Sequence, residues 1–445
     1  MGYDVLLLNA PLTKWKPEWI APPLGLMYIG GALESVGAKV KIVDMNFPGI
    51  RLEEILKDLE PGGLLGISCF TPGYRSSTRL AALTKALRPD VFVVLGGYHA
   101  SFCTDQVVGG QAPFDAAIIG PGEEPIIELY KCLGAKKIPE SLPNVIFREN
   151  YVDQCINTVQ CHLEMNKEKN SPLAKLTKRF SPARHLIRME DYIQVGSRFA
   201  GSVQFSRGCL YQCYFCQVRF MEGKWMPGDI EETVEEIKYL WKKYSLSSIV
   251  LVDNLFTGSP DIVYSFCKTL RKKVPDVLWS CDARVENLDR NLVKEMAASG
   301  CRSIFMGLES GDPDTLRRIG KNPDINIVKE KLKMLAEEGI KAFGSFIIGF
   351  PWEKESHIQK TISFATELPL AWMEFSFATP LPGTRLQSEL KQYGAKIVET
   401  NMEKWDGQTP VMKIPYISRT RLVDLYLEAI KAGYLRGQSV KPLTE

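Results

Sequence analysis

The chain has 445 residues, enough for two or three domains, and its fractions of hydrophobic (45%) and charged (24%) residues are those of an ordinary globular protein. The formal net charge of +3 gives no support for nucleic-acid or membrane-surface binding driven by bulk charge. The apolar run near Val5 is short and lacks a basic lead and a cleavage site, so it predicts a buried strand rather than a signal peptide. No stretch approaches the length of a membrane span, and we expect no membrane partner.

Residues 1–135 alternate short strand-like runs with amphipathic helix-like runs, and Gly and Pro mark the turns between them. The expected strands are Val5–Asn9, Val40–Asp44, Leu64–Cys69, Val91–Leu95 and Ala116–Ile119. This alternation predicts an α/β fold with a doubly wound, Rossmann-like parallel sheet. Ligands of such sheets bind at the carboxyl ends of the strands, where this chain places several glycine-rich turns.

Residues 136–200 lose the alternation and include the polar, Lys-rich stretch Asn166–Lys178. We expect this region to be a linker or a covering segment. The basic cluster of Lys175, Lys178 and Arg179 is more typical of a solvated face than of a binding site.

The alternation of strands and helices resumes in residues 201–385. The expected strands are Ser202–Ser206, Ser248–Asp253, Leu278–Asp282, Ser303–Gly307, Ala342–Ile348 and Met373–Ala378. Six strand–helix units in this length predict a partial, open (β/α)6 barrel rather than a closed eightfold barrel. Residues 386–445 are expected to form a small helical C-terminal tail, which either covers the substrate or packs as an ordinary helix.

The chain has 11 cysteines, and their odd number and irregular spacing argue against a disulfide framework. A reducing cytoplasm fits this pattern. Most of the scattered cysteines are expected to be small core residues; the scattered set is Cys69, Cys103, Cys132, Cys155, Cys161, Cys267, Cys281 and Cys301. The other three, Cys209, Cys213 and Cys216, are clustered directly after a predicted strand and a turn at Gly208.

The spacing of the three clustered cysteines predicts a 4Fe-4S cluster. Thiolates are the preferred ligands of iron–sulfur clusters, and three on one loop can hold three irons of a cubane and leave the fourth iron open. The alternatives are a zinc site or buried structural thiols. Structural zinc normally takes four protein ligands, often as two paired hooks, and no second hook lies nearby in the sequence.

The cysteine motif, with Phe215 at its aromatic position, resembles the Cys-x3-Cys-x-aromatic-Cys signature of the radical S-adenosylmethionine (SAM) superfamily. The resemblance covers residues 202–385. It implies that the open iron binds SAM, and that one electron from the cluster cleaves SAM to a radical that removes hydrogen from the substrate. It also implies an electron donor such as ferredoxin or flavodoxin.

The same resemblance implies that residues at the strand ends surround SAM. Arg284 would pair with the SAM carboxylate, a contact suited to a guanidinium, and Glu309 and Ser310 would meet its amino group or ribose. Each could instead be an ordinary turn or cap residue. The fifth strand departs from the family's Gly-x-Ile-x-Gly-x-x-Glu pattern, which favours Gly349 over Gly344 as the functional glycine. The implied SAM contacts are Phe215, Asp253, Arg284, Glu309, Ser310 and Gly349.

The N-terminal region resembles the sheet of cobalamin-binding radical SAM proteins. The resemblance rests on the turns that follow the first, third, fourth and fifth strands, where glycines let the backbone approach a flat ligand. A nucleotide-binding or purely structural sheet would carry similar turns. The implied cobalamin contacts are Asn9, Pro11, Ser68, Phe70, Thr71, Gly96, Gly97, His99, Gly120 and Glu123.

One departure from cobalamin modules concerns the metal's lower face. The Asp-x-His-x-x-Gly pattern, whose histidine ligates cobalt, is absent from this sequence. We interpret His99 as a pocket or capping residue near the nucleotide tail rather than a cobalt ligand. Thr71 and Tyr74 are the candidates for the lower face.

The resemblance implies a class B-like radical SAM C-methyltransferase that moves a methyl group from SAM, via methylcobalamin, to an unactivated carbon. A peptide or protein substrate is favoured, such as a glutamine of methyl-coenzyme M reductase, and a small molecule is the alternative. Two other functions stay open: non-methylating cobalamin-dependent radical SAM chemistry (cyclisation, ring rearrangement or lipid carbon–carbon coupling) and a non-catalytic cobalamin-binding protein. We expect a cytoplasmic monomer without a nucleic-acid partner.

Overall fold

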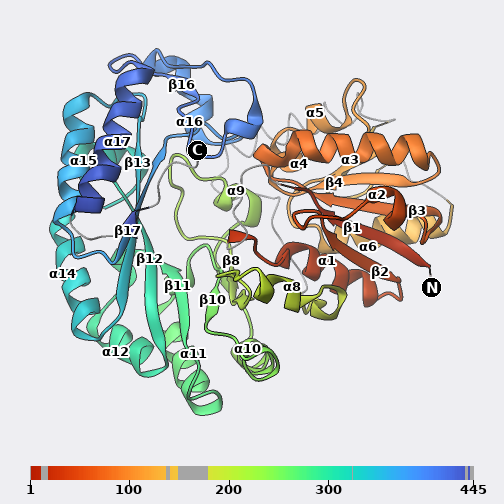
Figure 1. Ribbon diagram of the computed structural model, residues 1–445, viewed down its shortest axis with the longest axis horizontal. Coiled ribbons are helices and arrows are strands. Elements are labelled where there is room, and N and C mark those ends of the chain that lie inside the picture. Colours follow the sequence, from red (N-terminus) through yellow and green to blue (C-terminus); the bar gives the residue numbers. More distant parts are fainter. Residues whose placement is uncertain are drawn as a thin grey trace. The chain divides into compact units, whose positions relative to one another are not determined.

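The computed structural model describes residues 2–11, 19–136, 141–148, 179–322, 324–435 and 439–440. Two compact units make up the chain (Figure 1). The first comprises Met1–Arg198 with Phe220–Gly223, and the second Phe199–Arg219 with Lys224–Glu445. In the described part of the chain, no helix has both the length and the apolar character needed to cross a membrane.

The first unit is built on a six-stranded sheet with the order β2-β1-β3-β4-β5-β6. Neighbours among β1 to β5 pair in parallel, as predicted, and β6 runs antiparallel to β5. The doubly wound fold is therefore confirmed, with β6 as an unpredicted edge strand. The strands are β1 (Tyr3–Asn9), β2 (Val40–Asp44), β3 (Leu59–Ser68), β4 (Phe92–Gly96), β5 (Ala116–Ile118) and β6 (Val145–Phe147).

Helices cover both faces of this sheet because alternate strand residues point to opposite sides. Leu6 and Leu8 pack in the cluster that contains residues of α2 (Leu52–Leu56), α3 (Tyr74–Leu87), α4 (Tyr98–Phe102) and α5 (Thr104–Val108). Val5 and Leu7 pack in the opposite cluster, with α1 (Leu24–Glu34) and α6 (Glu123–Gly134). All four strand side chains are at most 1% exposed, and each contributes about 1.5–3 kcal/mol of burial free energy.

Part of the region predicted as a linker or covering segment packs on the first unit. The Ala183 N–H donates to the Met27 carbonyl at 2.9 Å. On α8 (Met189–Gln194), the Tyr192 hydroxyl donates to Asp44 Oδ2 at 2.8 Å. Residues 179–198 therefore belong to the same unit as the sheet. Lys175 and Lys178 of the predicted basic cluster lie outside the described residues.

The second unit is an open barrel of parallel strands with the order β17-β14-β13-β12-β11-β10-β7. The predicted six-strand partial barrel is confirmed, and β17 adds an unpredicted seventh strand from the C-terminal region. The strands are β7 (Ser202–Val203), β10 (Ile249–Leu251), β11 (Trp279–Ala283), β12 (Cys301–Glu309), β13 (Lys341–Ile348), β14 (Trp372–Phe377) and β17 (Ser439–Val440). Two small antiparallel pairs flank it, β8 (Ser206–Arg207) with β9 (Met226–Pro227) and β15 (Lys396–Ile397) with β16 (Met412–Lys413).

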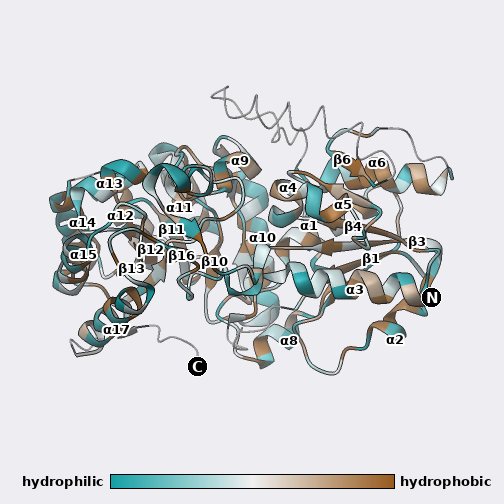
Figure 2. Cartoon of the chain, turned by 90° about the horizontal axis from the view of Figure 1, so that it is seen from above, coloured by the Kyte–Doolittle hydropathy of each residue, from teal (hydrophilic) through white to brown (hydrophobic). Residues whose placement is uncertain are grey.

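Amphipathic helices surround the barrel, and Figure 2 shows both hydrophilic and hydrophobic residues along α17. Aspartate side chains begin several of these helices, α14 among them through Asp324, by accepting a backbone N–H of the first turn, which stabilises each by about 1 kcal/mol. Other caps are Asp229, Asp289 and Asp312. The helices are α9 (Val218–Glu222), α10 (Ile230–Tyr244), α11 (Pro260–Lys273), α12 (Arg290–Ala298), α13 (Pro313–Ile319), α14 (Ile325–Glu337), α15 (Glu355–Glu367), α16 (Arg385–Ser388) and α17 (Arg419–Leu435).

Candidate functional site

The three clustered cysteines lie on a loop after β8 that is tied to the rest of the barrel unit. All three side chains are half-buried and free of disulfides. The Tyr214 N–H between them donates to the Ile319 carbonyl at 3.1 Å, at the end of α13, and the Tyr214 carbonyl accepts from Leu386 N at 3.0 Å. The loop backbone is therefore fixed on both sides.

The environment of the thiols suits anionic sulfur once iron is bound. Burial raises the pKa of Cys213, and the charges of Lys321 and Arg284 oppose that rise. Burial, together with the nearby Cys213 and Cys209, also raises the pKa of Cys216 to about 12. A bound metal deprotonates its thiol ligands outright, and the two cations would then face negative charge.

The described residues contain no group of three or more His, Cys, Asp or Glu side chains arranged to hold a single metal ion. A cubane makes a different demand, because its three protein ligands bind three separate irons and their sulfurs stand further apart. The half-buried loop with three thiols and adjacent cations fits that group.

Arg284, at the end of β11, reaches the cysteine loop as predicted for a SAM-binding position. Its Nη1 donates to Cys213 Sγ at 3.9 Å, and its guanidinium lies over the Tyr211 ring at 3.6 Å. A buried ion pair with Glu286, at 3.0 Å from Nη2 to Oε1, holds the opposite edge. The Nη1 edge therefore faces Cys213, and the contact of Arg284 with SAM stays a prediction.

Glu309 ends β12 in the left-handed region, with φ of 64°, which is uncommon for a residue with a side chain. Its Oε1 lies 3.2 Å from Lys321 Nζ, and both side chains are at most 10% exposed. Lys321 also donates to the Gly307 carbonyl at 3.0 Å. Sequence reasoning missed Lys321, because it follows a helix and not a strand.

Two other residues of the predicted SAM set already bond to nearby protein groups. The buried Asp253 carboxylate accepts the backbone N–H groups of Phe205, at 3.4 Å, and of Ser206. The Ser310 hydroxyl lies 2.9 Å from Thr361 Oγ1 on α15. Both residues therefore fix the backbone around the site, and direct contact with SAM stays a prediction for them.

An apolar wall stands beside the cysteine loop. The Phe215 ring lies 6.1 Å from that of Phe350, which in turn stacks on Trp352 at 5.2 Å. Gly349 begins this turn with φ of +88°, a conformation that favours glycine. Gly344 instead packs inside its strand, where a Cβ would lie 2.8 Å from Leu370 Cδ1. These contacts agree with the preference for Gly349.

Glu353 holds the Gly349 turn and predicts a pH dependence of stability. Its Oε2 accepts from Gly349 N and Phe350 N at 2.7 and 2.9 Å, and full burial raises its pKa to about 8. A raised pKa stabilises the fold below pH 4.5, and that contribution is lost as the pH rises through 8. Relative to the wild type, Glu353→Gln should gain unfolding free energy across this window, on the order of 5 kcal/mol. Urea unfolding of both proteins at pH 5, 7 and 9 checks this, and a constant difference would contradict it.

Glycines shape the predicted cobalamin edge of the N-terminal sheet. Gly97 has φ of +95°, and a Cβ there would lie 2.7 Å from the Cys69 carbonyl. A Cβ at Gly96 would meet nothing within 4 Å. The Ser101 hydroxyl donates to the Gly97 carbonyl and accepts from Gly120 N, each at 2.9 Å. The turns after β4 and β5 are therefore joined, and the backbone at Gly96 is open to a ligand.

The other predicted cobalamin contacts lie along the same edge. Ser68 is in register with Asn9 on one side and Gly96 on the other. The Asn9 side-chain amide donates to Asp44 Oδ1 at 3.0 Å, so its NH2 group already has a protein hydrogen-bond partner. Pro11 is half-buried, and Glu123 is buried at the start of α6.

Phe70, after β3, is an exposed aromatic at this edge. Its side chain is 58% exposed, and its ring stacks on Tyr98 with centroids 5.5 Å apart. An exposed, stacked ring of this kind offers a flat apolar surface to a ligand.

His99 is fully buried between Thr71 and Tyr74. Its Nδ1 lies 3.4 Å from Thr71 Oγ1, and its ring lies 4.1 Å from the Tyr74 ring. Burial lowers the pKa of His99 to about 4, so the ring is neutral at pH 7. Its Nε2 is buried without a hydrogen-bond partner. This placement agrees with a pocket residue. Tyr74, a candidate for the lower face, donates its hydroxyl to the Gln106 carbonyl at 2.6 Å.

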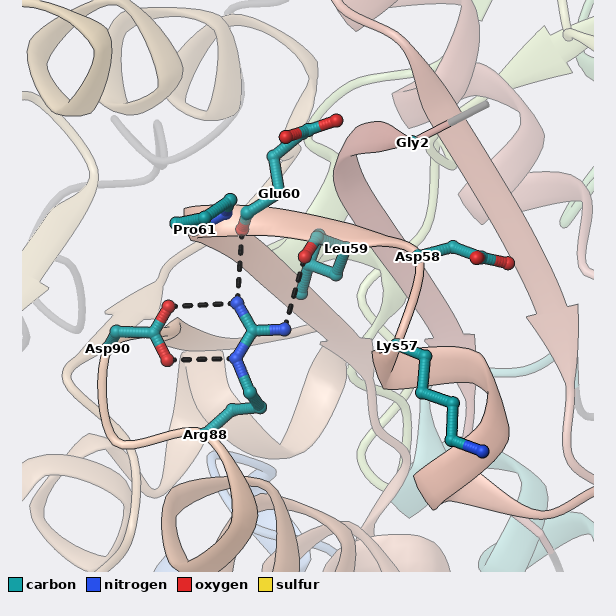
Figure 3. A pocket seen from close by; sticks show the side chains of 8 residues that line it. All are labelled: Gly2, Lys57, Asp58, Leu59, Glu60, Pro61, Arg88 and Asp90. Atoms are coloured by element: carbon teal, nitrogen blue, oxygen red, sulfur yellow. Dashed lines mark hydrogen bonds and ion pairs between the residues drawn. The ribbon is translucent and has the colours of Figure 1, made fainter.

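The pocket in Figure 3 lies at the other end of this sheet, around the start of β3. Arg88 fills its floor and donates to both Asp90 oxygens, at 2.9 and 2.8 Å, and to the Leu59 and Glu60 carbonyls. These protein partners satisfy the guanidinium. Since ligands of doubly wound sheets bind at the carboxyl ends, we assign this pocket a structural role.

Comparison with known proteins assigns both units to families. Residues 16–130 match the B12 binding domain, and residues 203–365 match the radical SAM superfamily. These matches cover the glycine-lined sheet edge and the cysteine loop, respectively. The predicted cofactors, a 4Fe-4S cluster, SAM and cobalamin, agree with this pair of domains.

Two curated relatives match most of the chain. The uncharacterized methyltransferase PH0819 of Pyrococcus horikoshii is 29% identical over 93% of this chain and 88% of its own. The anaerobic magnesium-protoporphyrin IX monomethyl ester cyclase of Rubrivivax gelatinosus is 24% identical over 92% of this chain and 72% of its own.

A solved structure shares the fold of the whole chain. The radical SAM methyltransferase TsrM from Kitasatospora setae, with cobalamin and a [4Fe-4S] cluster bound, is 17% identical, with a TM-score of 0.73 over 98% of this chain and 91% of its own. The likeness shows a shared fold, and the two family matches show that the chain combines a B12 binding domain with a domain of the radical SAM superfamily, a pair that agrees with a 4Fe-4S cluster, SAM and cobalamin as cofactors.

Proposed function

We propose that the protein moves a methyl group from SAM, by way of cobalamin, onto an unactivated carbon of its substrate. The observation that carries the proposal is a single chain with both a glycine-lined B12-binding edge and a three-cysteine loop flanked by cations. An unactivated carbon is not a nucleophile, so its methylation needs radical chemistry, which the bound cofactors supply.

The protein's own residues would bind and orient the reactants. Cys209, Cys213 and Cys216 would hold the cluster, and the free edge of Arg284 would orient the SAM carboxylate. The stacked rings of Phe350 and Trp352 would keep water from this side of the loop. We also propose a ferredoxin or flavodoxin as the electron donor, and a monomeric, cytoplasmic protein.

The interior of the barrel supports a substrate group that donates hydrogen bonds. On β14, Met373 and Phe375 are buried toward the helices, so the half-buried Glu374 between them points inward. Ser345 lies beside Glu374 in register on β13. The Asp282 side chain, on β11, is exposed to solvent. Desolvation by the surrounding protein and the negative charges of Asp253 and Glu374 raise the pKa of Asp282 to about 7.

These acceptors suit a carboxamide, because its NH2 group donates two hydrogen bonds. Apolar contact for the rest of a side chain comes from the rings of Phe305, Phe343 and Trp372, with centroid separations near 6 Å. The proposal therefore favours a peptide or protein side chain such as glutamine, as in methyl-coenzyme M reductase.

Mass spectrometry of peptide products tests the proposal. Reconstituted enzyme is incubated with cobalamin, a reductant, deuteromethyl-labelled SAM and a peptide that contains the target glutamine. We expect a product heavier by one labelled methyl group that replaces hydrogen on carbon, and none from the peptide with alanine in place of glutamine. Methylation of a nitrogen atom, or SAM cleavage without mass gain, would contradict it.

A non-methylating reaction is the second candidate, because one of the relatives is named as a cyclase. In that reaction, SAM would be cleaved to 5′-deoxyadenosine without S-adenosylhomocysteine, and the product would lose hydrogen rather than gain carbon. Quantifying both SAM products in the same incubation therefore separates the two candidates.

A further inference from the structure

Two ion pairs from different parts of the barrel each place a cation near Cys213. Arg284–Glu286 lies after β11, and Lys321–Glu309 joins the end of α13 to the end of β12. We propose that Lys321 is a positioning residue that holds Glu309 beside the cysteine loop, and that its positive charge raises the reduction potential of the cluster. The inference requires the cluster on the three cysteines, but not the methylation reaction.

The first support is the contact between the end of α13 and the cysteine loop. The Ile319 carbonyl accepts the Tyr214 N–H at 3.1 Å. At Gly320, which has φ of +79°, a Cβ would lie 3.7 Å from the Gln212 carbonyl oxygen and 4.0 Å from Cys213 Cα. Lys321 is the next residue, so its backbone is fixed directly beside a cluster ligand.

The second support is the way in which the side chains of Lys321 and Glu309 fit over Gly307. Lys321 Nζ lies 3.0 Å from the Gly307 oxygen and 3.2 Å from Glu309 Oε1. A Cβ at Gly307 would lie 2.3 Å from that same Oε1. Because Gly307 has no side chain, the Lys321–Glu309 pair fits at this position. The pair in turn holds Glu309 in its left-handed backbone conformation.

The third support is electrostatic. Lys321 brings a positive charge into a buried ion pair, one residue after Gly320, where a Cβ would lie 4.0 Å from Cys213 Cα. A buried ion pair costs desolvation free energy and is weak as a stability device, so a role in the site explains its presence better. Since reduction adds negative charge to the cluster, a nearby cation favours the reduced form and raises the potential.

A redox titration of the reconstituted holoenzyme, without SAM or substrate, tests the inference. The electron paramagnetic resonance signal of the reduced cluster is followed against potential. For Lys321→Met, we expect about a tenfold lower ratio of reduced to oxidised cluster at a fixed potential, which is a shift of about 59 mV to more negative values for one electron. Lys321→Arg keeps the charge and should leave the potential near the wild-type value.

Glu309→Gln should shift the reduction potential to more positive values, because it removes a negative charge near the cluster and leaves Lys321 in place. The control is Lys329→Met, which breaks the exposed pair with Glu367 and should change nothing. Iron and cobalamin contents verify that each variant is loaded. Shifts of Lys321→Met and Glu309→Gln in the same direction, or no shift at full iron content, would overturn the inference. If Lys321→Met does not retain the cluster, the Glu309→Gln variant decides: a shift of the potential to more positive values supports the inference, and a shift to more negative values overturns it.

Discussion

Replacing Cys213 with alanine is expected to abolish reductive cleavage of SAM while cobalamin stays bound. The variant leaves only two of the three clustered thiols, so one iron loses its protein ligand and the cluster is no longer held. The Gly96–Gly97 edge belongs to the other compact unit and is unchanged. Production of 5′-deoxyadenosine with dithionite should fall below detection, as measured by liquid chromatography, and the corrinoid absorbance should persist after gel filtration.

The matched control for this variant is Cys132→Ala, a half-buried thiol on α6 in the first unit. It should retain the cluster, cobalamin and SAM cleavage. Loss of cobalamin together with iron in Cys213→Ala would show that the two cofactor sites depend on each other more than their separate units suggest. Zinc in place of iron at the loop of the wild-type protein would remove the basis of the radical chemistry.

Replacing Gly96 with leucine is expected to weaken cobalamin binding at least tenfold without a large loss of stability. A Cβ at this position meets no protein atom within 4 Å, so the new side chain can be accommodated by the fold. It would project from the carboxyl end of β4, where the ligand is expected to approach the backbone. Equilibrium binding of hydroxocobalamin and the thermal unfolding midpoint measure the two effects separately.

Two further glycine variants serve as comparisons for Gly96→Leu. Gly134→Leu at the end of α6 also adds a side chain where a Cβ meets nothing within 4 Å, and it should bind cobalamin normally. Gly97→Ala should instead destabilise the unit by about 2 kcal/mol, because its Cβ meets the Cys69 carbonyl in a left-handed conformation. If Gly96→Leu bound cobalamin like the wild type, the edge at β4 would not be the binding surface.

The sequence allowed both sheets and the cysteine loop to be predicted, because buried parallel strands give apolar runs between helical patterns. Val40–Asp44 was predicted to the residue, and Arg284 directly follows its strand, as the sequence indicated. The three-residue β6 and two-residue β17 are too short to leave such a pattern.

Other features depend on tertiary contacts that no local pattern reports. Lys321 reaches Glu309 from the far end of α13, twelve residues along the chain, and nothing in its neighbourhood marks it as a site residue. Asp253 was predicted to end its strand but lies two residues after β10, which ends at Leu251, and only the structure shows that its carboxylate bonds to the backbone before the cysteine loop. Ser310 bonds to Thr361 on a helix that begins more than forty residues later.

The return of residues 179–198 to the first unit limits how this protein can be divided for engineering. A cobalamin cassette cut at residue 135 would lack Tyr192, whose hydroxyl bonds to the buried Asp44, and Phe180, which packs on Ala32 and Ile127. Grafts that exchange this module between enzymes should place the junction after Arg198, where the continuous part of the compact unit ends, so that the sheet keeps the segment that packs on it.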